Sequence, residues 1–358
     1  MKKKMLAVLL ASAMVASLTA CGGSNSADTA DTTKTEESGD SAEAADTKDA
    51  SEFKVGLITD VGGVNDGSFN QSSWEGLERA GEELGVTVNY LESATDADYA
   101  PNLETFVDED YDLIISVGYM LADATRAAAE ANPDTKFAII DDSSIDLPNV
   151  TSLIFHAEQA SYLVGYVAGL TTKTNNIGFV VGMTNETMNQ FGYGYYAGAK
   201  DANPDVFNAN SFADSATGKT MANTAITNGA DIVFQAAGAT GLGVIEACQE
   251  AGVYAIGVDS DQSSIAPNTV LTSAMKRVDN AVYEAVQELI DGTLEGGIKS
   301  FDLAAGGVDI APSQDLIAPE VITAVEEVKE KIVSGEVVVP ADKESFEAKY
   351  GADAYQLD

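Results

Sequence analysis

The sequence predicts an α/β protein built from two lobes, each a doubly wound parallel sheet. From Phe53 onward, short apolar runs alternate with helical patterns, and the runs are unbroken rather than interrupted by polar residues. Strands of that kind are buried on both faces, which is typical of parallel sheets covered by helices. The alternation occurs in two series of comparable size, and the roughly 300 residues involved are enough for two domains.

The first series begins with a strand at 54–59 (KVGLIT). A helix over 68–84 follows it, and Ser68 and Gln71 have the spacing of a capping box at the start of this helix. Further apolar runs predict strands at 113–117, 137–140 and 153–155, with an Ala-rich helix after the first of them. A helix over 159–170 then leads into the second series.

The second series repeats this pattern. Apolar runs predict strands at 177–181, 206–212, 231–236, 255–258 and 271–274. Helical patterns between and after them predict helices at 188–202, 219–227, 243–251 and 279–289, and a last helix at 319–334. An acidic, Tyr-containing tail ends the chain.

The N-terminus has the features of a lipoprotein signal peptide over residues 1–20. Three lysines precede an apolar run that is too short to span a bilayer, and Leu-Thr-Ala-Cys follows, ending at Cys21. This site resembles the bacterial lipobox, in which Cys21 becomes the diacylated mature N-terminus and two acyl chains give a stable anchor. A plain signal peptide cut before a chance cysteine is the alternative. Residues 21–52, which are acidic and poor in apolar side chains, are expected to form a disordered linker.

Composition argues against several classes of function. The formal net charge of −38 disfavours nucleic acid and anionic lipid surfaces as partners. His156 is the single histidine, so nucleophilic catalysis lacks its usual base, and we expect a structural or hinge role for it. Cys248 is expected to be a small buried hydrophobe. No metal site, cofactor or enzymatic activity is predicted.

Polar and aromatic residues gather where the predicted strands end, the place at which open parallel sheets bind ligands. In the first series they are Asp60, Ser68, Phe69, Asn70, Asp141 and Asp142. In the second series they are Phe212, Asp214, Gly238, Asp259, Asp261, Gln262 and Lys276. Carboxylates accept from hydroxyl or N–H groups, an ammonium donates, and aromatic faces hold a flat ring. Each residue alone could be a helix cap or a core side chain, but their convergence on one edge of both sheets favours a ligand cleft.

Five segments resemble the basic membrane protein family of bacterial lipoproteins. They are 60–72 (DVGGVNDGSFNQS), 155–169 (FHAEQASYLVGYVAG), 191–200 (FGYGYYAGAK), 234–243 (FQAAGATGLG) and 257–262 (GVDSDQ). The match runs in order from about residue 54 to 309. The family includes purine nucleoside receptors of ATP-driven importers and has the type I periplasmic-binding-protein fold, with three hinge crossings between its lobes.

For the domains, the resemblance implies that lobe 1 comprises 53–156 and about 279–306, and lobe 2 about 157–278 and about 307–340, before a tail at 341–358. For the ligand, it implies that Phe69 and Phe212 sandwich a base and that Phe191 is a further wall. Either Phe191 or Phe212 is then the main stacking residue of lobe 2.

The polar contacts implied by the resemblance fall into two groups. Asp141, or Asp142 beside it, accepts from the base edge, with Asp60 and Asn70 nearby. The ribose is held by Asp259, Lys276 and the backbone at Gly238. The protein would then be a monomer on the extracytoplasmic face of the cell membrane, delivering a nucleoside to an ABC permease and its ATPase. A sugar receptor of the same fold, and a regulatory or adhesive lipoprotein uncoupled from transport, are the alternatives.

Overall fold

The structure is a computed structural model that describes residues 48–213, 218–352 and 355, and of residues 208–213 the backbone alone. The predicted signal peptide, the predicted acylation site Cys21 and residues 22–47 of the predicted linker lie outside the described residues. Within the described part, no helix combines the length and the apolar character needed to cross a membrane.

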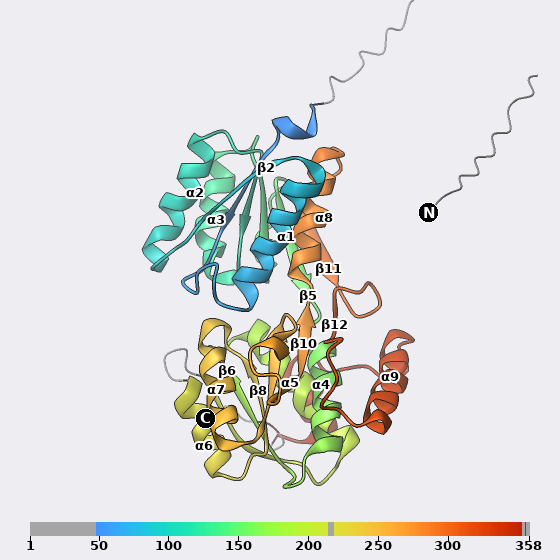
Figure 1. The fold of residues 1–358 in the computed structure, drawn as a ribbon. Helices are drawn as coiled ribbons and strands as arrows, with labels where there is room; N and C mark the ends of the chain where they lie inside the picture. The colour runs from blue at the N-terminus through green and yellow to red at the C-terminus, as the bar shows by residue number, and fades with distance from the viewer. Residues whose placement is uncertain (1–47, 214–217, 353–354, 356–358) are drawn as a thin grey trace, which may run out of the picture. The chain divides into compact units, whose positions relative to one another are not determined.

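The first sheet has six parallel strands in the order β11-β5-β4-β3-β1-β2 (Figure 1). They are β1 (Lys54–Ile58), β2 (Thr87–Leu91), β3 (Leu113–Ser116), β4 (Lys136–Ile140), β5 (Val150–Phe155) and β11 (Gly297–Phe301). Helices α1 (Phe69–Leu84) and α8 (Val278–Ile290) cover one face, and α2 (Tyr99–Asp108) and α3 (Ala122–Ala131) cover the other. Successive residues of a strand point to opposite faces of the sheet. Ile115 packs in the core with α1 and Ile114 in the core with α2, so both faces of the sheet are buried.

The second sheet repeats the same order, β12-β10-β9-β8-β6-β7. Its strands are β6 (Asn176–Val181), β7 (Phe207–Ala213), β8 (Ile232–Ala236), β9 (Tyr254–Asp259), β10 (Val270–Lys276) and β12 (Val308–Ile310). Its helices are α4 (Ala157–Thr171), α5 (Glu186–Ala202), α6 (Gly218–Thr227), α7 (Gly241–Ala251), α9 (Pro319–Val333) and α10 (Lys343–Tyr350). Helices α4 and α5 pack on one face, and α6 and α7 pack on the other, where Cys248 is fully buried.

Short 3-10 helices lie at η1 (Ala50–Glu52), η2 (Asp96–Asp98), η3 (Tyr119–Leu121), η4 (Gly238–Thr240) and η5 (Gln262–Ser264). Of these, η3 and η4 directly follow the strands β3 and β8 and carry residues of the site described below.

The predicted pair of doubly wound parallel sheets is confirmed, with one departure. Strand β12 runs antiparallel to β10 at the edge of the second sheet. The sequence did not predict β2, β11, β12, α2 or α10. The strands among these are short edge strands, and β2 and β11 lack the unbroken apolar runs of central strands because much of their surface is exposed.

Three segments pass between the two sheets. They are His156 between β5 and α4, Arg277 between β10 and α8, and residues 302–307 between β11 and β12. Hydrogen bonds tie them together, because the His156 N–H donates to the Phe301 carbonyl at 3.0 Å and the Arg277 N–H donates to the Gly307 carbonyl at 2.9 Å. The predicted lobe boundaries fall near these crossings and stay a prediction.

Glycines bring α4 and α5 into backbone contact. A Cβ atom on Gly165 would lie 2.0 Å from the Tyr195 carbonyl oxygen, and one on Gly194 would lie 2.1 Å from the Glu158 carbonyl oxygen. No side chain fits in those spaces, so glycine is required at both positions. This close packing fixes α5, whose residues Met188 and Phe191 line the candidate site.

Candidate ligand-binding site

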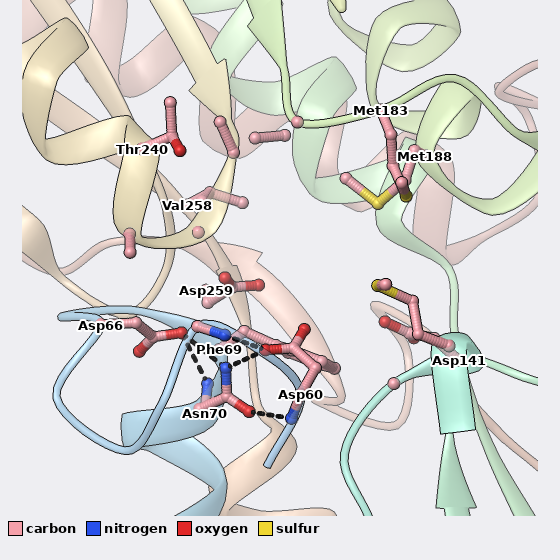
Figure 2. A pocket seen from close by; sticks show the side chains of 18 of the residues that line it. Asp60, Asp66, Phe69, Asn70, Asp141, Met183, Met188, Thr240, Val258 and Asp259 are labelled. Atoms are coloured by element: carbon pink, nitrogen blue, oxygen red, sulfur yellow. Dashed lines mark hydrogen bonds between the residues drawn. The ribbon is translucent and has the colours of Figure 1, made fainter. Parts of the chain in front are cut away.

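A cavity of about 390 Å³ lies at the carboxyl ends of the strands of both sheets (Figure 2). From the first sheet it is lined by residues that follow β1, β3 and β4 and by the first turn of α1. From the second sheet it is lined by residues that follow β6 and β8, by the ends of β9 and β10, and by α5. Its volume is in the range of small-molecule sites, and its position is where parallel sheets bind ligands.

Most of the ligand contacts expected from the sequence line this one cavity. They are Asp60, Phe69, Asn70, Asp141, Phe191, Gly238, Asp259 and Lys276. Phe212 lies on the edge strand β7, paired with Val180, and its side chain is outside the described part of the structure. Asp142 does not line the cavity, because its carboxylate accepts from the N–H and hydroxyl of Ser144. Asp141 is therefore the member of the acidic pair that lines the cavity.

The start of α1 is held by Asp66, which was not predicted from the sequence. One carboxylate oxygen of Asp66 accepts from the N–H groups of Ser68 and Gln71, and the other accepts from the N–H and side-chain amide of Asn70. The predicted capping box is wrong, because the Ser68 side chain makes no capping hydrogen bond. A buried carboxylate can accept from several N–H groups at a helix N-terminus, and it satisfies more of them than one hydroxyl would.

Asn70 in turn fixes Asp60 at the end of β1. Its amide donates to Asp60 Oδ1 at 2.8 Å, and its side-chain oxygen accepts from the Asp60 N–H at 3.2 Å. The Gly62 N–H also donates to Asp60 Oδ1, at 2.8 Å. Burial raises the pKa of Asp60, and these hydrogen bonds oppose the shift. Asp60 is thus held in a single orientation at the cavity wall (Figure 2).

Asp141 and Asp259 occupy matching places in the two sheets. Asp141 follows β4 and Asp259 ends β9, and these strands have the same position in the two strand orders. Both residues have a φ of 64°, in the left-handed region that non-glycine residues rarely adopt. Residues held in this region cluster at functional sites, and here the turn directs both carboxylates into the cavity.

Each of these carboxylates meets a group from the opposite sheet. The Ser68 hydroxyl donates to Asp259 Oδ2 at 2.5 Å, and the Lys276 ammonium forms a buried ion pair with Asp141 Oδ2. Burial raises the pKa of Asp259 to about 6, while the Lys276 charge and the Ser68 hydrogen bond oppose the shift. Charged groups buried to this extent are costly unless they are paired, and each of these two carboxylates has a partner from the other side of the cavity.

Lys276 also lies among aromatic rings. Its Nζ atom is 4.5 Å from the ring centroid of Phe69, 5.2 Å from that of Phe155 and 6.0 Å from that of Phe191. At these distances the ring quadrupoles attract the ammonium. Among the described lining residues Lys276 is the only cation, whereas Asp60, Asp66, Asp141 and Asp259 are carboxylates. The cavity therefore presents chiefly hydrogen-bond acceptors to a ligand.

Gln262, which belongs to the 257–262 segment, forms a second bridge between the sheets. Its amide donates to the Gly67 carbonyl at 2.9 Å, on the loop that precedes α1. Its side-chain oxygen accepts from the Gln235 amide at 2.8 Å and from the Val258 N–H at 3.1 Å. The sequence placed Gln262 at a strand end but did not predict this bridge, since no local pattern reveals a partner 195 residues away.

Further lining residues were not predicted at all. They are Val61, Gly62, Gly118, Tyr119, Met120, Gly182, Met183, Met188, Ala236, Ala239, Thr240 and Val258. Methionine and small apolar residues give no distinctive signal in a sequence. Only their position directly after strands could have indicated them.

His156 lies at a crossing between the sheets and does not line the cavity. Its Nδ1 is 2.9 Å from Glu158 Oε1, and its Nε2 is 2.9 Å from Ser300 Oγ. The hydrogen bond to Glu158 raises the pKa of His156. Among the described residues there is also no cluster of three or more His, Cys, Asp or Glu side chains that could hold a metal ion.

Comparisons with known proteins agree with this architecture. A model of the family described as "ABC transporter substrate-binding protein PnrA-like" matches residues 53–343. The "CD4+ T-cell-stimulating antigen" of Listeria monocytogenes is 41% identical, over 95% of this chain and 99% of that protein. The "ABC transporter nucleoside-binding protein BmpA" of Lactococcus lactis is 36% identical, over 95% of this chain and 100% of that protein.

A solved structure shares the fold as well. The crystal structure of an ABC transporter system solute-binding protein from Aeropyrum pernix superimposes with a TM-score of 0.74 and 27% identity. The alignment covers 84% of this chain and 99% of the other.

Proposed function

We propose that this chain captures nucleosides for an importer, because it belongs to the PnrA-like family of ABC transporter substrate-binding proteins. The family resemblance and the two-lobed fold read from the sequence are both confirmed. Substrate-binding proteins of this class bind a solute and pass it to a permease and its ATPase without catalysing a reaction. The nucleoside ligand, the closing motion and the membrane anchor are proposals.

The observation that carries the proposal is the combination of aromatic rings with carboxylates in one cavity. Phe69 from the first sheet and Phe191 from the second line it, together with Asp60, Asp141 and Asp259. A flat base can stack on an aromatic ring, which contributes about 1–3 kcal/mol and tolerates different bases. Ribose hydroxyls and base N–H groups would donate to the carboxylates, and charge-assisted hydrogen bonds are roughly twice as strong as neutral ones.

The roles within the cavity follow the family assignment. Asp141 accepts from the base edge with Asp60 and Asn70 nearby, and Asp259, Lys276 and the Gly238 backbone hold the ribose. Phe212 remains a candidate for a second stacking ring opposite Phe69.

Binding is proposed to close the two lobes about the three crossings. The cavity takes its walls from both sheets, so a ligand gains all its contacts only when they are close together. The permease would then recognise the closed form. Diacylation of Cys21 would keep the protein, as a monomer, on the extracytoplasmic face of the membrane.

A thermal-shift screen of the purified protein tests the ligand class. A compound that binds only the folded state raises the melting temperature, so purine and pyrimidine nucleosides, free bases and sugars are compared at equal concentration. A shift with nucleosides supports the proposal. A shift with sugars alone would make the protein a sugar receptor, and no shift with any of them would favour a role outside solute transport.

Small-angle scattering tests the closing motion. Guanosine is expected to reduce the radius of gyration, and ribose alone to leave it unchanged, because a ligand shifts the equilibrium only by its differential affinity for the two states. Guanosine binding without compaction would refute hinge closure and leave the ligand class intact.

A further inference from the structure

The cavity contains a group of methionines that ligand binding does not by itself require. Met120, Met183 and Met188 all line it. Met120 belongs to η3, which follows β3 of the first sheet, while Met183 follows β6 and Met188 lies on α5 of the second. Figure 2 shows Met183 and Met188 reaching toward the cavity on the side that faces Asp141. Thioethers therefore contribute to both walls.

Two of these methionines are accessible to small solutes. Met120 is 37% exposed and Met183 is 41% exposed, whereas Met188, Met221 and Met275 are half-buried. Met221 packs against the core between the second sheet and its helices α6 and α7, and Met275 lies within β10. Among the described methionines, the two most exposed residues, Met120 and Met183, thus both line the cavity.

We propose that Met120 and Met183 are sites of reversible oxidation by peroxide, and that their oxidation lowers ligand capture. The thioether sulfur attacks one peroxide oxygen, an S–O bond forms as the O–O bond breaks, and the other oxygen leaves as water. The sulfur is oxidised to the sulfoxide by two electrons and one equivalent of hydrogen peroxide is reduced. A methionine sulfoxide reductase reverses the change.

The expected effect on binding follows from the surroundings. A thioether is a flexible apolar side chain suited to packing against a ring, whereas a sulfoxide is polar and accepts hydrogen bonds. The cavity already holds Asp60, Asp66, Asp141 and Asp259, so a further acceptor offers nothing new to a ligand and removes apolar contact area. This effect on capture rests on the proposed nucleoside binding; the oxidation of the two side chains does not.

Peptide mass spectrometry of the purified protein after a graded peroxide treatment tests the modification. Met120 and Met183 are expected to oxidise before Met221 and Met275, and saturating guanosine is expected to slow the oxidation of the first pair only. Oxidation that begins at Met221 or Met275 would overturn the proposal. If the untreated protein binds no nucleoside, the proposed function fails, but the order of oxidation still decides the present inference.

Calorimetry tests the consequence for binding. Peroxide treatment of the native protein is expected to weaken guanosine by about tenfold, the scale of losing one buried apolar side chain, and reductase treatment is expected to restore it. A Met120→Leu/Met183→Leu variant should keep the same affinity before and after peroxide, whatever that affinity is. The control variant Met221→Leu/Met275→Leu should remain as sensitive as the parent. Equal sensitivity of both variants would refute the link between these methionines and capture.

Discussion

Replacing Asp259 by asparagine should stabilise the protein at neutral pH. Asparagine keeps the shape of the side chain and can still accept from the Ser68 hydroxyl, but it carries no charge. Burial raises the pKa of Asp259 from 3.8 to about 6. A raised native pKa means that this group supports folding below about pH 4 and loses that contribution as the pH rises through about 6. The shift of about two units corresponds to about 3 kcal/mol.

Urea denaturation of the parent and of Asp259→Asn across this range measures the effect. The variant's gain in unfolding free energy should grow by up to about 3 kcal/mol between about pH 4 and pH 7. Asp134→Asn, at an exposed position, is the matched control, and its difference from the parent should not follow this course. A gain that does not change with pH would refute the reasoning.

The same substitution should damage function. Losing a charge-assisted hydrogen bond in the cavity should cost about 1.5–3 kcal/mol of ribonucleoside affinity. Calorimetry with guanosine, inosine and hypoxanthine separates the ribose contact from the base contact. Equal losses for the nucleosides and for the free base would disprove the assignment of Asp259 to the ribose. A residue that lowers stability and raises affinity is what a functional site is expected to contain.

Three further changes test other parts of the structure. Phe69→Ala should cost about 1–3 kcal/mol of nucleoside affinity, measured by calorimetry, because a stacking ring is lost. The control Phe207→Ala, at an exposed site, should cost none. Full affinity after loss of the Phe69 ring would exclude stacking there. Gly165→Ala should lower the unfolding free energy by about 1–3 kcal/mol, because the added Cβ atom would clash with the Tyr195 carbonyl oxygen. An unchanged midpoint of urea denaturation would show that the helices accommodate the Cβ atom. Cys21→Ala should abolish fatty-acid labelling and release the protein from the membrane fraction, and label retained on the variant would exclude acylation at this residue.

The fold was predictable where hydrophobic burial alone determines the structure. The central strands β1, β3, β4, β6, β8 and β9 are buried on both faces and read as unbroken apolar runs. Neither the edge strand β2 (TVNYL) nor the edge strand β11 (GIKSF) has a fully buried residue. Backbone pairing with the neighbouring strand holds such edge strands in place, and this pairing leaves no apolar pattern in the sequence.

The start of α1 illustrates a different limit. The sequence contains several oxygens that could cap this helix, including those of Asp66 and Ser68. The spacing to Gln71 favoured Ser68, yet the Asp66 carboxylate caps the helix and Ser68 turns to Asp259. The path of the preceding loop and the contacts with the opposite sheet decide which side chain caps the helix. Neither can be read from the local sequence.

The charged residues at the strand ends of the candidate site were predictable one by one, but their pairs were not. Strand ends indicated Asp60, Asp141, Asp259 and Lys276, because ligands bind at that edge of a parallel sheet. The partnerships Ser68–Asp259 and Lys276–Asp141 join residues 191 and 135 positions apart. Such pairs arise where the two sheets face each other, and no local sequence pattern reveals them.

In these pairs one carboxylate could serve both the proposed closure and the proposed ligand binding. Asp259 accepts from Ser68 through Oδ2, and Asp141 meets Lys276 through Oδ2, so in each case the bridge between the sheets uses one carboxylate oxygen. A carboxylate has two oxygens and about four acceptor positions. Ligand hydrogen bonds to Oδ1 would therefore add to the bridge without breaking it. An amide has only one acceptor oxygen for both tasks, so aspartate at the two matching strand ends suits the proposed function better than asparagine.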